Sequence, residues 1–190
     1  MHWTAVKRIM RYLKGTSSLG LMYHANEEDS CLTGYSDADW AGDIDDRKST
    51  SGYIFEFAGG AISWRSKKQT CVALSTAEAE YMALANACQE AIWLKRMFES
   101  LMNTKRDTPV RIYEDNQSAI CMSKNPQCHG RAKHINIKFH FVREQVNNEK
   151  IELVYCPTDL MKADMFTKNL NGPKFKELRS LIGMVEIDLV

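Results

Sequence analysis

Residues 110–120 read VRIYEDNQSAI, and this short stretch joins the pattern of a strand to the pattern of a helix. Val110 and Ile112 carry β-branched side chains, which favour a buried strand. Glu114 and Asp115 then follow directly, before a polar run that leads into the helical pattern. A carboxylate at the end of a buried strand is held rigidly. Asp115 is therefore a candidate metal ligand, with an ordinary helix cap as the alternative.

The composition is that of one folded domain. The chain has 190 residues, 44% of them hydrophobic, which is enough for a packed core. The net charge of +1 gives no strong overall attraction to nucleic acid. No apolar run reaches the roughly 18 residues of a membrane span, and the N-terminal segment lacks a signal-peptide pattern. We expect an intracellular protein that makes no contact with a membrane.

The cysteines do not indicate a metal site. None of the six belongs to a C-x-x-C pair, and without a secretion signal we expect reduced thiols. Cys121, Cys128, His129 and His134 lie close in sequence, but their spacing fits no common zinc finger or ribbon. We therefore expect no zinc.

The order of elements predicts an α/β fold. From residue 31 onward the patterns read β-β-β-α-β-α-α-β-α, after an amphipathic helix over residues 3–13 and a short strand or arm over residues 21–29. Gly59 and Gly60 join two strands as a hairpin, and Ser75 or Thr76 can cap the long helix that follows. A helix is expected over residues 159–170 and a last one over residues 174–183. Early hairpins followed by alternating strands and helices favour a mixed sheet, first antiparallel and then parallel.

Carboxylates at the ends of elements form the most informative pattern. In open α/β sheets, functional groups collect beyond the carboxyl ends of the strands. Several acids gathered there would repel one another unless cations held them, and oxygen ligands suit Mg²⁺ or Mn²⁺. Two such ions about 4 Å apart can stabilise the attacking and the leaving oxygens of a phosphodiester. The acids in question are Asp37, Glu80, Asp115 and Asp164.

Longer motifs resemble the ribonuclease H domain of copia-type (Pseudoviridae) retrotransposon Pol polyproteins. They are GYSDADWAGDIDDRKSTSGYIF, ISWRSKKQTCVALSTAEAEYMAL, IYEDNQSAI, KHINIKFHFVREQV and YCPTDLMKADMFTKNL, in this order over nearly the whole chain. The leading HWTAVKRIMRYLKGTSSLGLMY resembles the tail of the reverse transcriptase that precedes the domain in such polyproteins. The resemblance suggests three segments: a reverse transcriptase tail over residues 1–28, a ribonuclease H-like domain over 29–170 and a helical extension over 171–190.

The resemblance implies a five-stranded mixed sheet flanked by helices and two-metal hydrolysis of the RNA strand in RNA–DNA hybrids. The family's carboxylates fall on Asp37, Glu80, Asp115 and Asp164, which would bind two Mg²⁺ or Mn²⁺ ions. Asp39 competes with Asp37 but lies beyond the expected strand end. Glu78 competes with Glu80, and the two side chains point roughly 200° apart around the helix. The family pattern has the acid directly before an apolar-x-Ala step, which EYMAL fits at Glu80, and Glu80 lies nearer the core-facing stripe. Alternation along the strand sends Glu114 to the face opposite Asp115.

One departure from the family concerns a histidine. Many ribonucleases H carry one shortly before the last aspartate, and YCPTDLMKAD has none. His134 or His140 is a candidate replacement, with a structural histidine as the alternative. Polar and basic side chains are expected to contact the hybrid, whose 2′-hydroxyl distinguishes it from DNA. The candidates are Ser75, Asn116, Gln117, Lys67, Lys68, Lys133, His134 and His140.

The expected partners are an RNA–DNA hybrid and the reverse transcriptase domain of a parent polyprotein. The expected compartment is the cytoplasm, in a virus-like particle, with the nucleus as an additional site. Two other classes of function stay open at this point. The chain could be a catalytically silent nucleic-acid-binding remnant, or an interaction domain that uses the exposed apolar helix at its N-terminus.

Overall fold

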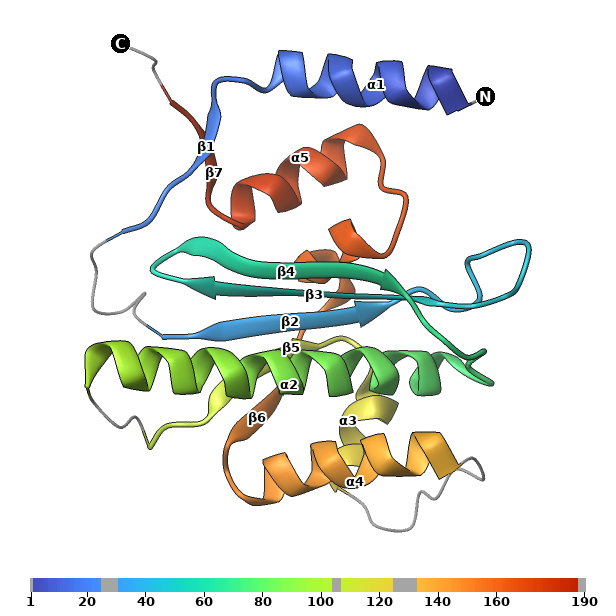
Figure 1. The fold of residues 1–190 in the computed structure, drawn as a ribbon, viewed down its shortest axis with the longest axis vertical. Helices are drawn as coiled ribbons and strands as arrows, with labels where there is room; N and C mark the ends of the chain where they lie inside the picture. Colours follow the sequence, from blue (N-terminus) through green and yellow to red (C-terminus); the bar gives the residue numbers. More distant parts are fainter. Residues whose placement is uncertain (1, 25–30, 104–106, 125–132, 188–190) are drawn as a thin grey trace.

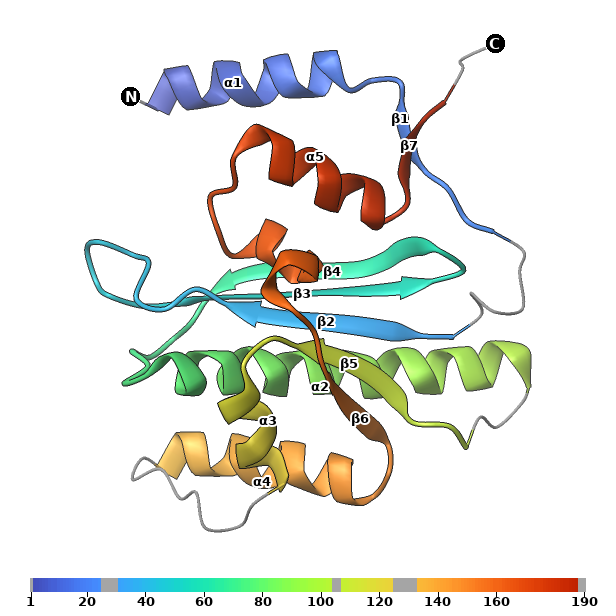
Figure 2. The same ribbon diagram turned by 180° about the vertical axis from the view of Figure 1, so that it is seen from behind.

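The protein is a sheet with helical layers on both faces (Figures 1 and 2). The computed structural model describes residues 2–24, 31–103, 107–124 and 133–187, and only the backbone of residues 133–136. The sheet has five strands in the order β4-β3-β2-β5-β6. Their bounds are β2 (Thr33–Ala38), β3 (Thr50–Phe57), β4 (Gly60–Lys68), β5 (Val110–Glu114) and β6 (Ile151–Tyr155).

The pairing of the strands confirms the expected mixed sheet. Strands β2, β3 and β4 pair antiparallel, whereas β5 pairs parallel with both β2 and β6. The β3–β4 hairpin turns through Ala58 and Gly59, whose φ angles of 54° and 78° are both positive. Positive φ at both central residues is the pattern of a type I′ turn, whose twist matches the flanking strands. The hairpin therefore depends on Gly59, while Gly60 already belongs to β4.

The helices are divided between the two faces of the sheet. Helix α2 (Thr76–Met102) lies across one face, and α3 (Gln117–Lys124) and α4 (Lys133–Asn147) lie on the same side. The other face carries the 3₁₀ turn η2 (Lys162–Phe166), then α5 (Gly172–Leu181) and, outermost, α1 (His2–Gly15). None of the described helices has the length and apolar character needed to cross a bilayer.

Helix α2 forms because its sequence supplies both a cap and an apolar face. The Ser75 Oγ accepts a hydrogen bond from the Glu78 backbone N–H at 3.2 Å, which confirms the expected N-cap. Tyr81, Leu84 and Cys88 recur at helical spacing and are buried against the sheet. Tyr81 also spans to α4, where its hydroxyl donates to the Phe139 carbonyl at 3.2 Å. Packing on this face fixes the position of the first turn of α2.

The expected helix over residues 159–170 is wrong. The chain there forms two 3₁₀ turns, η1 (Thr158–Leu160) and η2, separated by Met161 in an extended conformation. Met161 is fully buried and packs with Cys156 and Ala163. In a continuous helix Met161 and Ala163 would point roughly 200° apart, whereas here both are buried in the same cluster.

The two ends of the described chain pair with each other. Strand β1 (Leu19–Leu21) runs antiparallel to β7 (Met184–Glu186) in a small separate sheet. Strand β7 was not predicted from the sequence. A strand or arm was expected over residues 21–29, and its part from residue 25 onward lies outside the described residues. The pairing brings the segments proposed as a leading tail and a C-terminal extension into direct contact.

Candidate metal centre

Three carboxylates from three different elements come together at one edge of the sheet. Asp37 lies near the end of β2, Asp115 directly follows β5, and Glu80 lies in the second turn of α2. One oxygen from each carboxylate lies within 4.8 Å of one oxygen from each of the others. Strands β2 and β5 are parallel, so their carboxyl ends meet at the same edge. The topology therefore brings together residues that are far apart in the chain.

The burial of these acids is costly without a cation. Asp37 is 0% exposed and Glu80 is 6% exposed. Burial raises the pKa of Glu80 to about 11, and the nearby charges of Glu114, Asp37 and Asp115 add to the effect. Among the described residues, none offers a hydrogen bond to the buried Glu80 Oε2. An all-oxygen donor set with an unsatisfied buried oxygen fits a divalent cation such as Mg²⁺ or Mn²⁺.

Asp164 lies outside this group of three but is linked to it. Its carboxylate is buried in η2, and burial raises its pKa to about 6. The Lys168 Nζ lies 2.7 Å from Asp164 Oδ1 and 3.0 Å from Asp37 Oδ1. A lysine therefore bridges two of the four carboxylates that the family resemblance assigns to metal binding.

Threonines donate hydrogen bonds to two of the acids. The Thr167 hydroxyl donates to Asp37 Oδ2, and the Thr158 hydroxyl donates to Asp115 Oδ2 at 2.8 Å. Thr158 belongs to the segment YCPTDLMKAD, which lacks the histidine that many ribonucleases H carry there. Neither threonine nor Lys168 was selected from the sequence. For Thr167 and Lys168 the signal was the stretch DMFTK, in which they follow Asp164 by three and four residues.

Glu114 is closer to the site than its position suggested. Alternation along β5 turns its side chain toward α2, where it is fully buried. Burial raises the pKa of Glu114 well above its usual value, and its charge contributes to the raised pKa of Glu80. The expected alternation was therefore no reason to set Glu114 aside, because this face of β5 packs against α2, the helix that carries Glu80.

The competing acids have other partners. Asp39 Oδ1 accepts a hydrogen bond from the Thr50 backbone N–H, which closes the loop after β2. Glu78 Oε2 accepts one from the Leu74 backbone N–H at 2.8 Å, which stabilises the approach to α2. The structure thus brings Asp37 and Glu80, rather than Asp39 and Glu78, into the acidic group.

The polar candidates for substrate contact lie at the starts of helices. Ser75 caps α2, and Asn116 caps α3 by accepting a hydrogen bond from the Ala119 N–H at 3.1 Å. Gln117 is the first residue of α3 and is exposed. Asn116 and Gln117 directly follow Asp115, so they share the edge of the sheet with the acids.

The basic candidates are less uniform. Lys68 forms ion pairs with Asp43 at 2.5 Å and Asp46 at 3.0 Å, while Lys67 is exposed and lines a shallow pocket of about 170 Å³ with Lys138. His140 is exposed on α4. The side chains of Lys133 and His134 lie outside the described residues, as do Cys128 and His129 of the cysteine–histidine cluster.

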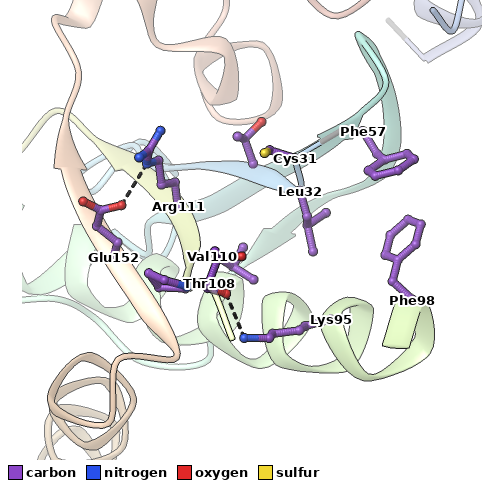
Figure 3. A pocket seen from close by; sticks show the side chains of 11 residues that line it. Cys31, Leu32, Phe57, Lys95, Phe98, Thr108, Val110, Arg111 and Glu152 are labelled. Carbon is purple, nitrogen blue, oxygen red and sulfur yellow. Dashed lines mark hydrogen bonds and ion pairs between the residues drawn. The ribbon is translucent and has the colours of Figure 1, made fainter. Parts of the chain in front are cut away.

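A separate cavity lies at the opposite end of the sheet (Figure 3). It measures about 220 Å³, and apolar side chains such as Leu32, Phe57 and Phe98 line it. The ion pair between Arg111 and Glu152, at 2.8 Å, lies at its wall. The cavity lies beside the first residues of β2 and β5, whereas the acids lie at the other ends of these strands. It is therefore separate from the acidic group.

Comparison with solved structures gives the fold. LC11-RNase H1, isolated from compost by a metagenomic approach, superposes with a TM-score of 0.52 at 17% identity over 73% of this chain and 93% of that one. RNase H1 from Halobacterium salinarum gives a TM-score of 0.50 at 16% identity over 72% of this chain and 93% of that one. The fold is that of ribonuclease H. No family model matches the sequence.

Comparison with curated sequences shows the family to which the chain belongs. The Pol polyprotein of transposon TNT 1-94 from Nicotiana tabacum is 49% identical over 183 residues, which are 96% of this chain. The chain is a homologue of copia-type retrotransposon Pol polyproteins. A second Pol polyprotein, from transposon RE2 of Arabidopsis thaliana, is 41% identical over 98% of the chain. The chain spans only 14% and 13% of the lengths of these two Pol polyproteins.

Proposed function

We propose that this chain is a retrotransposon ribonuclease H that cleaves the RNA strand of RNA–DNA hybrids with the help of two divalent ions. The observation that carries the proposal is the convergence of Asp37, Glu80 and Asp115 within 4.8 Å at the end of a ribonuclease H sheet. The kinship to Pol polyproteins supports it, because reverse transcription produces RNA–DNA hybrids.

In this proposal the carboxylates divide the binding of two Mg²⁺ or Mn²⁺ ions among them. Asp37 would be a ligand of both ions, Glu80 and Asp115 would hold one, and Asp164 would hold the other. When bound there, such ions would lower the pKa of an attacking water and stabilise the leaving 3′ oxygen. Hydrolysis then leaves a 5′-phosphate and a 3′-hydroxyl.

The remaining residues hold the acids in place. Thr167 donates a hydrogen bond to Asp37, and Thr158 donates one to Asp115. These bonds fix the orientation of both carboxylates. Glu114 is fully buried on β5, and its charge adds to the raised pKa of Glu80. No side chain is needed as a nucleophile, because the attacking group is water.

Recognition of the hybrid is assigned to side chains around the acids. Ser75, Asn116 and Gln117 are placed beside the RNA strand, where they can detect the 2′-hydroxyl. The basic side chains contact phosphates, so that binding weakens as salt is raised. These are Lys67, Lys68 and Lys133, with His134 and His140.

The proposed protein partner is the reverse transcriptase domain of the parent polyprotein. Helix α1 supports this, because its apolar residues Trp3, Ile9 and Leu13 are 64%, 60% and 61% exposed. A polymerase domain packed there would cover these side chains and increase the affinity for the hybrid. We place the activity in cytoplasmic virus-like particles, with the nucleus as an additional site.

The test is cleavage of a labelled RNA–DNA hybrid in Mg²⁺ or Mn²⁺ by the wild type and by Asp115→Asn. Replacing even the hydrogen-bond partners of metal ligands typically costs 10–100-fold, so loss of a direct ligand should slow cleavage by at least about 100-fold. Glu152→Gln is the matched control, because it removes a carboxylate at the other end of the sheet. Its cleavage rate should equal that of the wild type.

Other outcomes separate the alternatives. If the wild type binds the hybrid but cuts neither strand, with or without the polymerase domain, the chain is a catalytically silent remnant. If Asp115→Asn cuts as fast as the wild type, the acidic group is not the active site. Cleavage in the presence of EDTA would exclude a role for divalent ions.

A further inference from the structure

The Lys168 ammonium lies between Asp37 of the acidic group and the neighbouring Asp164. The ammonium lies 3.0 Å from Asp37 Oδ1 and 2.7 Å from Asp164 Oδ1, and both of these carboxylates are buried. Asp37 is thereby hydrogen-bonded through both oxygens, since Thr167 donates to the second one. The Lys168 side chain itself is 35% exposed, so it has an open route to solvent.

The backbone holds Lys168 in this place. The N–H groups of Thr167 and Lys168 both donate to the Asp164 carbonyl, at 3.2 and 2.9 Å. The segment also packs closely on β3 at Gly52, the residue paired with Asp37 in the sheet. A Cβ at Gly52 would lie only 2.7 Å from Thr167 Cγ2, so the contact requires glycine. The fold therefore fixes the backbone from which the Lys168 side chain extends to the two carboxylates.

We propose that Lys168 holds the place of a divalent ion between Asp37 and Asp164, so that the ion must displace the ammonium in order to bind. The proposal rests on the function proposed above, because it assigns these two carboxylates to an ion. It goes beyond that function by giving the protein a built-in competitor for one of its own metal sites.

The charges explain why a competitor is useful. Two carboxylates buried side by side are unstable without a positive charge, and one ammonium bonded to both supplies it. Burial alone would lower the pKa of Lys168, but the charges of Asp37 and Asp164 raise it, so the ammonium stays protonated. The metal-free protein therefore keeps its acids in place, at the cost of weaker binding of the ion.

The test is a titration of the protein with MnCl₂ alone, with free Mn²⁺ followed by electron paramagnetic resonance. Lys168→Gln should bind Mn²⁺ at least tenfold more tightly than the wild type, which corresponds to about 1.4 kcal/mol. Lys168→Arg keeps the positive charge and should bind as weakly as the wild type. Lys162→Gln is the matched control, because Lys162 forms a buried ion pair with Glu56 at 2.7 Å and lies outside the acidic group.

Thermal unfolding provides a second measure. In EDTA, Lys168→Gln should melt below the wild type, and saturating Mn²⁺ should raise its melting temperature by more than it raises that of the wild type. Lys162→Gln should also melt lower, but with the wild-type response to Mn²⁺. If Lys168→Gln does not fold in EDTA, Mn²⁺ should restore its folding by replacing the lost positive charge between Asp37 and Asp164, and failure to do so would overturn the competitor role.

The outcomes distinguish this proposal from the proposed function. If Lys168→Gln binds Mn²⁺ as the wild type does or more weakly, while the wild type still cuts the hybrid, the competitor role is overturned and the enzyme stands. If neither protein binds Mn²⁺ and the wild type does not cut the hybrid, both proposals fail. Tighter binding by Lys168→Gln supports the competitor role whether or not the isolated chain cuts.

Discussion

Replacing Glu80 by glutamine should make the metal-free protein less sensitive to pH. Glu80 is 6% exposed, its Oε2 finds no hydrogen bond among the described residues, and burial raises its pKa to about 11. Without metal the folded protein therefore keeps this carboxyl protonated at neutral pH, whereas the unfolded chain ionises it near pH 4.5. Because the folded state holds the extra proton, this group lowers stability progressively as the pH rises from about 4.5 towards 11.

The size of the effect follows from the pH span. One pH unit corresponds to about 1.36 kcal/mol for a proton that only the folded state retains, so a rise from pH 5 to pH 8 costs up to about 4 kcal/mol. Glutamine has nearly the same shape and cannot ionise. Between pH 5 and pH 8 the free energy of unfolding should therefore fall more in the wild type than in Glu80→Gln, and the difference should reach up to about 4 kcal/mol.

Urea unfolding in EDTA at pH 5 and at pH 8 measures this difference. Glu78→Gln is the matched control, because it removes a carboxylate from the adjoining turn of α2 that lies outside the acidic group. At pH 8, saturating Mg²⁺ should raise the free energy of unfolding of the wild type more than that of Glu80→Gln, because the variant lacks one carboxylate of the metal site. Equal pH dependence of Glu80→Gln and the wild type in EDTA would refute the argument, because Glu80 would then be ionised in the folded protein.

Three further substitutions test the parts of the fold that position the site. Ser75→Ala removes the N-cap of α2 and should lower the free energy of unfolding by about 1 kcal/mol, measured by urea denaturation. Leu84→Ala opens a cavity at a fully buried position and should cost about 2–5 kcal/mol in the same assay, whereas loss below 1 kcal/mol would mean that the core collapses around it. Gly52→Ala places a Cβ against Thr167 and should cost about 1–3 kcal/mol. It should also weaken Mn²⁺ binding, and unchanged binding would show that the η2 segment can shift without disturbing the acids.

Local patterns in the sequence were enough to predict most of the elements. The alternation in residues 110–114, the cap at Ser75 and the apolar face of α2 each depend on neighbours within a few residues, so they can be read from the chain alone. Asp37, Glu80 and Asp115 were candidates from local position, because each lies at or near the end of an element. Asp39 and Glu78 lie nearby as well, and the choice of Asp37 and Glu80 also used the family resemblance. Parallel pairing of β2 and β5 then brings the two aspartates to one edge.

What only the tertiary structure decided are the contacts between distant segments. Lys168 and Asp37 are 131 positions apart in the chain, and Thr158 and Asp115 are 43 apart, so no periodicity relates them. The two 3₁₀ turns replace the expected helix because Met161 is buried against other segments, which its local sequence does not reveal. Glu114 became important for the same reason: alternation gives the face of a strand, but only the packing of α2 shows that this face holds Glu80.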